Sequence, residues 1–415
     1  MTNLPEARAY QPCRACPVCD ALEGRLLFEQ RFAVLPGGSP LKGYDVVVCD
    51  RCGCAYADGL PSQEVLDAYY RDMSKYEYQE RQGRESQFDL ARFRRICEIV
   101  QQIVPSREAR IVDVGCATGG LLSVLKEAGY RNLLGVDPSP ACAEAAMRLY
   151  GIRVVTSVLG QAEIPAGSCE LVLLSAVLEH LRDAKPALCH LRTLLRQDGL
   201  IFVSVPDASR FAQFDDAPFQ QFSTEHVNYF GPRSLGNLMR ACGFMQLVCF
   251  QDSLERSPVQ AYIGPVLDAV YRKEEGMPAA LEKDLDTEPA LLAYIQQCEG
   301  VARRIRQTID RLVEGRRPIL VWGVGTHTLR LLRTSRLAEA DIAAFVDSNP
   351  RYAGTTLDGI PVIRPDQLCG RGDPILVSSR TFQAEILRQI RQELGLENEV
   401  FTLYDLPATA EGQSR

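Results

Sequence analysis

The chain has 415 residues, more than one ordinary hydrophobic core accommodates, so two or three domains are expected. Its 46% hydrophobic and 24% charged residues are typical of soluble globular proteins, and the net charge of −7 argues against a general nucleic-acid binder. No apolar run approaches the roughly 20 residues of a membrane span. The N-terminal MTNLPEARAYQPC lacks the apolar stretch of a signal peptide, so a cytoplasmic location is expected.

Cysteines cluster near the N-terminus, where six of the fifteen lie between residues 13 and 54. Two C-x-x-C pairs occur there, C-P-V-C at 16–19 and C-D-R-C at 49–52, with strand-like segments at 25–35 and 44–48 between them. Paired thiolates of this kind bind structural zinc tetrahedrally, so we predict a zinc ribbon in residues 1–60. Its predicted ligands are Cys16, Cys19, Cys49 and Cys52.

The first pair is ambiguous, because Cys13 and Cys16 also form a C-x-x-C. A metal-free cluster of small buried residues is one alternative. A redox pair is another, although the thioredoxin-like βαβ pattern is missing around it. Four thiolates leave no open metal position, so the expected role of the zinc is structural.

Residues 61–107 have the sequence of a helical connector, with V-L-D-A-Y-Y early and F-D-L-A-R-F-R-R-I-C later. Four tyrosines occur in it, and they either pack between the neighbouring modules or cover a ligand pocket. They are Tyr69, Tyr70, Tyr76 and Tyr78.

The segment Ile111–Gly120, I-V-D-V-G-C-A-T-G-G, is expected to organise the chain. Its β-branched start predicts a buried parallel strand, its glycines a tight turn, and the apolar residues after them a helix. Glycine lets the backbone approach a ligand, and the helix N-terminus offers free N–H groups. A second apolar strand ends in Asp137, roughly 20 residues past the glycines, where a carboxylate can accept from both hydroxyls of a ribose.

Asp113 stands before the first glycine, where it would repel a pyrophosphate and favour a cationic ligand. The V-D-V-G-C-A-T-G motif, with V-D-P downstream, resembles motif I and the acidic loop of the class I S-adenosylmethionine (SAM) methyltransferases, whose ligand is a sulfonium that carries an amino group. The alternatives are a fold that binds NAD and a fold that has lost its ligand. Seven short strands suit the Rossmann-like α/β sheet of that family within residues 108–265; they are expected at 110–115, 133–137, 153–157, 170–175, 199–205, 245–250 and 258–264.

Further motifs extend the resemblance along this domain. The Q-A-E-I-P segment looks like the one that flanks the adenine, and S-A-V-L-E-H-L follows the strand below the methyl-transfer point. The SAM-binding residues that the resemblance implies are Asp113, Gly115, Cys116, Ala117, Gly119, Asp137, Gln161, Ala162 and Ser175.

Histidines are rare, with four in the chain, and His180 and His226 both follow predicted strands at the expected ligand edge. An imidazole suits general base catalysis near neutral pH, and Glu225 beside His226 can raise its basicity or orient it. The alternatives are that His180 lines the SAM pocket as a structural residue and that His226 only caps or packs.

A more specific resemblance comes from the order of the modules. A zinc-binding module, a SAM domain with E-H-x-x-Y-F and a second nucleotide-type domain resemble the sugar C-methyltransferases, which methylate the carbon next to the keto group of a nucleotide-linked keto-deoxy sugar. The base of that family lies in an H-E-H motif, which corresponds here to His226 with Glu225 beside it. The chain departs from it at Thr224, where the first histidine would stand, and at Ser223, where a tyrosine is usual. C- and O-methylation therefore both stay open.

Residues 266–315 are expected to form a helical linker, and residues 316–408 a second Rossmann-like domain with a G-V-G turn after its first strand. Thr328 replaces the third glycine of a dinucleotide fingerprint. The resemblance implies that this domain binds the nucleotide part of the substrate; a module that only packs or dimerises is the alternative. Its candidate lining residues are Gly323, Gly325, His327, Asp347 and Ser379.

The predicted function is methyl transfer from SAM to a small, nucleotide-activated keto-deoxy sugar, at carbon through an enolate. The alternatives are an O-methyltransferase of a saccharide or another small metabolite, a non-catalytic scaffold that binds zinc and SAM, and a zinc-dependent nucleic-acid methyltransferase. SAM and structural zinc are the expected cofactors. A small molecule, rather than nucleic acid or a membrane, is the expected partner, with a homodimer as one option.

Overall fold

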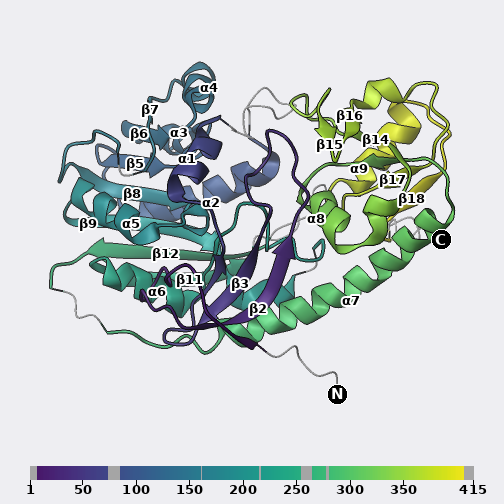
Figure 1. Cartoon of the computed structure of the whole chain (residues 1–415). Coiled ribbons are helices and arrows are strands. Elements are labelled where there is room, and N and C mark those ends of the chain that lie inside the picture. Colours follow the sequence, from purple (N-terminus) through teal and green to yellow (C-terminus); the bar gives the residue numbers. More distant parts are fainter. Residues whose placement is uncertain are drawn as a thin grey trace, which may run out of the picture.

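The computed structural model describes residues 7–72, 85–159, 161–214, 216–253, 264–276 and 280–405. Three β-sheets organise these residues, a small antiparallel one and two α/β sheets (Figure 1). The predicted fold class is thereby confirmed. Within the described ranges, no helix combines the length and the apolar character that crossing a bilayer requires.

The antiparallel sheet takes its last strand from far along the chain. Asn228 and Tyr229 pair with Tyr56 and Ala55, so the segment that follows His226 adds a strand to the N-terminal module. In spatial order the strands are β1 (Arg8–Tyr10), β2 (Gly24–Arg31), β3 (Gly43–Cys49), β4 (Ala55–Asp58) and β10 (Asn228–Tyr229).

The seven-stranded sheet has the spatial order β11-β12-β9-β8-β5-β6-β7, with β12 antiparallel to both of its neighbours and the other pairs parallel. Its central strands are nearly continuous apolar runs because helices cover both faces. The strands are β5 (Arg110–Val114), β6 (Asn132–Asp137), β7 (Val154–Thr156), β8 (Cys169–Ser175), β9 (Leu195–Pro206), β11 (Phe244–Ser253) and β12 (Pro265–Lys273).

Helices α2, α3 and α4 contribute to the core on one face of this sheet, and α5 and α6 to the core on the other. Helix α2 lies within the predicted connector, but its apolar side packs against α3. The elements are α1 (Gln63–Asp72), α2 (Gln87–Ile103), α3 (Gly120–Glu127), α4 (Pro140–Tyr150), the 3-10 turn η1 (Leu178–His180), α5 (Ala184–Leu194), the 3-10 helix η2 (Ala208–Gln213) and α6 (Pro232–Ala241).

The seventh strand lies later than predicted. It was expected at 258–264, of which 258–263 fall outside the described residues, and the structure has β12 at Pro265–Lys273. The true strand carries an acid at its centre, Asp268, which breaks the apolar pattern. That carboxylate is buried because Arg95 of α2 lies 2.8 Å from it. The first part of the predicted helical linker is therefore a strand of this sheet.

The C-terminal sheet is parallel apart from its edge hairpin, with the order β15-β16-β14-β13-β17-β18. The long helix α7 (Thr287–Glu314) runs along one side of the molecule to reach it (Figure 1). Its elements are β13 (Ile319–Trp322), α8 (Thr326–Thr334), the 3-10 turn η3 (Arg336–Glu339), β14 (Ile342–Val346), β15 (Thr356–Leu357), β16 (Ile360–Ile363), the 3-10 turn η4 (Pro365–Leu368), β17 (Ile375–Val377), α9 (Gln383–Arg388), the π-helical turn η5 (Gln389–Glu393) and β18 (Val400–Thr402).

Candidate active site

The glycine turn after β5 is fixed by its own backbone and by one carboxylate. Gly115 (φ +72°) and Gly119 (φ +81°) adopt left-handed conformations that favour glycine. Asp137, at the end of β6, accepts one hydrogen bond on each carboxylate oxygen, from the N–H of Ala117 and from the N–H of Ser139, both at 2.9 Å. A carboxylate oxygen has a further lone pair, so Asp137 shapes the loop and can still accept from a ribose hydroxyl.

Asp113 places a carboxylate in the interior beneath this loop, with 3% of its surface exposed. Burial raises the pKa of Asp113 to about 8; the positive charge of Arg92 opposes the shift and the negative charge of Asp137 adds to it. A cation bound nearby would favour the ionised form. At the end of β8, the buried hydroxyl of Ser175 has no hydrogen-bond partner among the described residues. The buried carboxylate of Asp113 and the hydroxyl of Ser175 therefore fit SAM, which brings positive charge and polar groups to the loop.

The other predicted SAM residues differ in what they can offer. The thiol of Cys116 points away from the loop into the core, where a Cβ on Gly135 would lie 2.5 Å from its sulfur, so its backbone is the part left for a ligand. Ala162 is buried among core residues. Gln161 is exposed, with its backbone N–H bonded to the carbonyl of Val158. The roles of Gln161 and Ala162 stay predictions.

Glu85, just before α2, belongs to this region and was missed by the sequence analysis. Its carboxylate accepts from the hydroxyl of Thr118 at 2.8 Å. A Cβ added at Gly120 would lie 2.4 Å from that carboxylate, which places it against the N-terminal end of α3. No local motif marks Glu85, since its partners lie more than thirty residues further on.

His180 and His226 lie side by side, with ring centroids 5.0 Å apart and an interplanar angle of 72°. His180 comes from η1 after β8, and His226 from the turn before β10. The Nδ1 atom of His180 is 3.1 Å from both the hydroxyl of Tyr70 and the carbonyl of Glu225. Its Nε2 atom is 3.9 Å from a carboxylate oxygen of the buried Glu179.

Helix α1 contributes two tyrosines to this pair. The hydroxyl of Tyr69 donates to the carboxylate of Glu225 at 3.0 Å, while Tyr70 contacts His180. The sequence predicts that these tyrosines pack between the modules or cover a ligand pocket. In the structure, Tyr69 and Tyr70 contact the candidate catalytic residues directly. Tyr76 and Tyr78 lie outside the described residues.

The two departures from the H-E-H pattern both shape the turn that carries His226. The hydroxyl oxygen of Ser223 accepts from the backbone N–H groups of Glu225 at 3.2 Å and His226 at 3.1 Å. The hydroxyl of Thr224 lies 3.4 Å from that of Thr326, the first residue of α8. The turn is therefore connected to the C-terminal sheet through a residue that the sequence analysis treated as a departure.

A cavity of about 450 Å³ lies where the three sheets meet, and His226 and Glu225 contribute to its wall. The size suits a small ligand. Its other walls come from the carboxyl-terminal ends of β8 and β9 and from the first turn of α8, so one cavity faces both α/β sheets. Two cationic side chains also line it, Arg92 of α2 and Arg351 after β14. Sequence reasoning did not select these arginines, because neither belongs to a local motif.

Gly325 is the one member of the predicted C-terminal lining set that lines this cavity. His327 is buried instead, with its Nε2 atom 3.0 Å from the hydroxyl of Tyr404, and burial lowers the pKa of His327 to about 3, which keeps the ring neutral. The side chain of His327 therefore packs inside the domain, and its predicted role in binding a nucleotide stays a prediction.

The remaining members of that set do not line this cavity either, and their predicted role in binding a nucleotide stays a prediction. The carboxylate of Asp347 accepts from backbone N–H groups, including that of Val324 at 3.0 Å. Gly323 (φ +107°) packs against the carbonyl of the residue before Ser379. The hydroxyl of Ser379 accepts from the N–H of Phe382 at 3.1 Å. In the structure these residues shape the loops that follow β13, β14 and β17.

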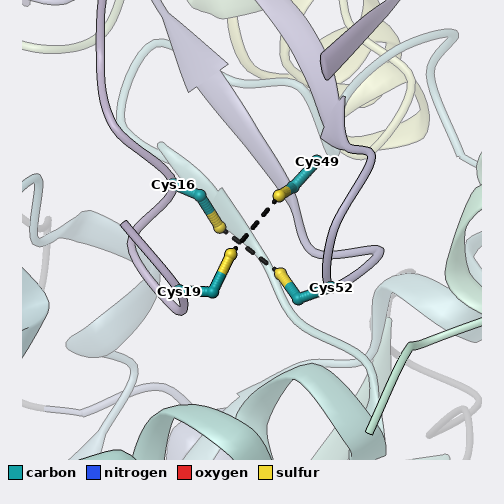
Figure 2. Close-up of side chains that lie close together, drawn as sticks. All are labelled: Cys16, Cys19, Cys49 and Cys52. Carbon is teal, nitrogen blue, oxygen red and sulfur yellow. Dashed lines mark hydrogen bonds between the residues drawn. The ribbon is translucent and has the colours of Figure 1, made fainter. Parts of the chain in front are cut away.

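The four predicted zinc ligands converge at the N-terminal sheet (Figure 2). Their sulfur atoms all lie within 4.8 Å of one another, with 3.5 Å between Cys16 and Cys52 and 3.5 Å between Cys19 and Cys49. Tetrahedral zinc with bonds near 2.3 Å would place the sulfur atoms roughly 3.7 Å apart. The set therefore fits zinc. Cys13 is exposed and outside the cluster, so the geometry favours Cys19.

Comparisons with known proteins identify a methyltransferase domain in this chain. A family model described as a methyltransferase domain matches residues 88–247, and a model described as C2185-like, N-terminal, matches residues 315–401. The C-methyltransferase NovU of Streptomyces niveus is 25% identical over 404 residues, which cover 92% of each chain. A probable SAM-dependent methyltransferase of Mycobacterium tuberculosis is 26% identical over 54% of this chain and 84% of its own.

Among solved structures, the 1,6-didemethyltoxoflavin-N1-methyltransferase of Burkholderia thailandensis is 22% identical, with a TM-score of 0.41, over 55% of this chain and 98% of that one. The strand order, the glycine loop and the matched domain define a class I methyltransferase domain. The chain is thus a SAM-dependent methyltransferase, and the C-methyltransferase NovU is similar to it over nearly its whole length.

Proposed function

We propose that this enzyme methylates a carbon atom of a small, nucleotide-activated keto-deoxy sugar through an enolate. The observation that carries the proposal is the cavity that His226 and Glu225 share with the ends of β8 and β9 and with the first turn of α8. The match to NovU, a C-methyltransferase, over nearly the whole of both chains supports carbon as the acceptor atom.

The charges of the cavity support an activated sugar. Arg92 and Arg351 line it, and the first residues of α8 direct a helix N-terminus toward it. Guanidinium groups and helix N-termini both favour phosphate oxygens. Because Arg351 and the first turn of α8 both belong to the C-terminal domain, a sugar that carries a diphosphate would bind with its anionic part there and its sugar ring near His226.

In the proposed mechanism, the glycine loop, Asp137 and Asp113 bind the donor, and SAM supplies a methyl group on a positively charged sulfur. His226 takes the proton from the carbon next to the ketone. The electron pair of the broken C–H bond forms a carbon–carbon double bond and the carbonyl pair moves to the keto oxygen, which gives the enolate. The enolate carbon then forms a bond to the methyl carbon as the bond to sulfur breaks. Glu225 and His180 orient the base, and alignment of the two substrates supplies much of the rate.

The second candidate is O-methylation, in which His226 would take the proton of a sugar hydroxyl. Ser223 and Thr224, which replace the usual residues of the C-methyltransferase motif, keep this candidate open. The two candidates differ at the acceptor atom alone, so the donor site serves both.

We also propose that Cys16, Cys19, Cys49 and Cys52 bind one structural zinc ion, because their four sulfur atoms satisfy its preferred number and spacing. A cytoplasmic location and a homodimer stay predictions.

Methyl transfer from labelled SAM to matched nucleotide sugars tests the proposal. Each sugar is offered as the ketone and as the corresponding alcohol, in deuterated solvent. We expect label in the ketone alone, together with deuterium exchange at the neighbouring carbon. That exchange should require His226. Label in the alcohol would establish O-methylation instead. SAM binding without label in any nucleotide sugar would overturn the proposed substrate class.

A further inference from the structure

Arg14 lies in the N-terminal module between the first two cysteines of the chain and is 6% exposed. Its guanidinium donates to four carbonyl oxygens. Nη1 donates to the backbone carbonyls of Ala57 at 3.1 Å and Val227 at 3.2 Å. Nη2 donates to the side-chain carbonyl of Asn228 at 3.0 Å and to the backbone carbonyl of Arg182. Burying a charge is costly unless hydrogen bonds compensate it, and these bonds do so.

Asn228 extends this network to η1. Its side-chain amide donates to the carbonyls of Leu178 and Leu181, both at 2.8 Å. The backbone N–H of Val227 donates to the carbonyl of Glu179 at 2.7 Å. The turn that carries His180 and the segment that follows His226 are thereby connected to each other and to Arg14.

The segments that carry the two histidines are thus both hydrogen-bonded, directly or through Asn228, to one buried cation. Val227, whose carbonyl accepts from Arg14, directly follows His226, and the residues that Asn228 binds flank His180. We propose that Arg14 is a positioning residue that couples the N-terminal module, which carries the four cysteines, to the geometry of the His180–His226 pair. This inference rests on the proposed role of His226 as the base. A misplacement of about 1 Å can cost roughly 100-fold in rate, so the connection would be visible in turnover.

A second arginine of the same module provides a matched control. Arg25, in β2, donates from two nitrogens to both carboxylate oxygens of Glu288 on α7, at 2.7 and 2.8 Å, and also contacts Asp50. It connects the module to a different element and does not reach the histidine turns. Loss of Arg25 would loosen the module without acting on the base.

The experiment compares R14A, R14K and R25A in the full chain. The acceptor is the nucleoside-diphosphate-linked keto-deoxy hexose that is labelled most rapidly in the test of the proposed function. We expect R14A to lower kcat by roughly 10- to 100-fold, with the Kd for SAM within about twofold, zinc content unchanged and partial rescue by added guanidinium. R14K should recover part of the loss, since an ammonium replaces some of the donors. R25A should lower the melting temperature and keep kcat near the wild-type value.

A readout independent of the acceptor uses the chain's four histidines. In histidine-labelled protein, R14A should shift the ring signals of His180 and His226 and leave that of His190 in place. Should R14A fail to fold, N228A replaces it and carries the same expectations. A wild-type kcat in R14A, or in N228A where it replaces R14A, would overturn the inference. Equal losses of kcat in R14A and R25A would overturn it as well. H226A separates the two proposals: an active H226A removes the base, whereas an inactive H226A beside an active R14A removes only the positioning role.

Discussion

Asp137 and Asp347 bind the loops of two different sheets in the same way. Asp137 is the last residue of β6, and Asp347 directly follows β14. Each uses one carboxylate oxygen for an N–H of the turn after the preceding strand, at 2.9 Å from Ala117 and 3.0 Å from Val324. The other oxygen accepts from the residue two positions further on, at 2.9 and 2.8 Å. An aspartate here is first a structural requirement of the loop, and any ligand contact is additional.

This relationship predicts different effects for two equivalent substitutions. D137A should weaken SAM binding at least tenfold, equivalent to about 1.4 kcal/mol, because the loop and the acceptor for the ribose are lost together. D347A should leave the Kd for SAM within about twofold and raise the KM for the nucleotide sugar, since the turn beside Thr326 shifts. Calorimetry with SAM and steady-state kinetics measure both. Equal loss of SAM binding in the two variants would show that Asp347 is not confined to the acceptor side.

His226 should be needed for the chemistry and not for donor binding. We expect H226A to lower kcat by roughly 100- to 10,000-fold, the range that general base catalysis contributes, with little change in the Kd for SAM. H190A is the matched control, because His190 lies on α5 and is absent from the cavity wall. Turnover of H226A near the wild-type value would exclude His226 as the base.

The raised pKa of Asp113 predicts a pH dependence of stability. Between its ordinary value of about 4 and about 8, the folded free protein keeps a proton on this carboxyl that the unfolded chain has lost. The stability of the free protein should therefore fall as the pH rises through this window. D113N removes this titration, so its melting temperature should exceed that of the wild type above about pH 8.

SAM binding gives the opposite trend for the same carboxylate. The bound cation favours the ionised form, so the affinity of the wild type relative to D113N should increase as the pH rises toward about 8 and then level off. The Kd for SAM is measured for the wild type and for D113N at several pH values. The ratio of the two Kd values cancels the contribution from the ionisation of SAM itself. Parallel curves would show that Asp113 stays protonated in the complex.

The cysteine cluster predicts a selective dependence on zinc. C49S and C19S should lose the metal and lower the melting temperature, because metal binding and folding of this module are coupled. C13S should keep its zinc, since that thiol lies outside the cluster. Elemental analysis with thermal denaturation measures both properties. Zinc retained in C19S and lost in C13S would move the site to the alternative C-x-x-C.

Local patterns predicted the parts of this protein that a short segment builds by itself. The glycine turn, the C-x-x-C pairs and the E-H motif each place their residues through a few neighbouring positions, and the structure brings them together. Asp347 shows the limit of this reasoning, because its pattern was correct and its side chain serves the loop instead of the cavity.

The features that were missed depend on distant partners. Tyr70 reaches His180 across 110 positions, and Arg14 reaches Val227 across 213, so no spacing rule connects them. The strand that contains Asp268 was misplaced for the same reason, since its charge is tolerated only beside Arg95 of another element.

The pairing of β10 with β4 also has consequences for folding during synthesis and for the independence of the N-terminal module. During synthesis the N-terminal sheet leaves the ribosome with β4 as an open edge, and that edge stays unpaired until Asn228 and Tyr229 emerge. The N-terminal module therefore cannot be removed or exchanged as an independent unit without losing a strand of its sheet. That last strand lies within the methyltransferase domain, next to the proposed base, so the module and the methyltransferase domain form one inseparable unit.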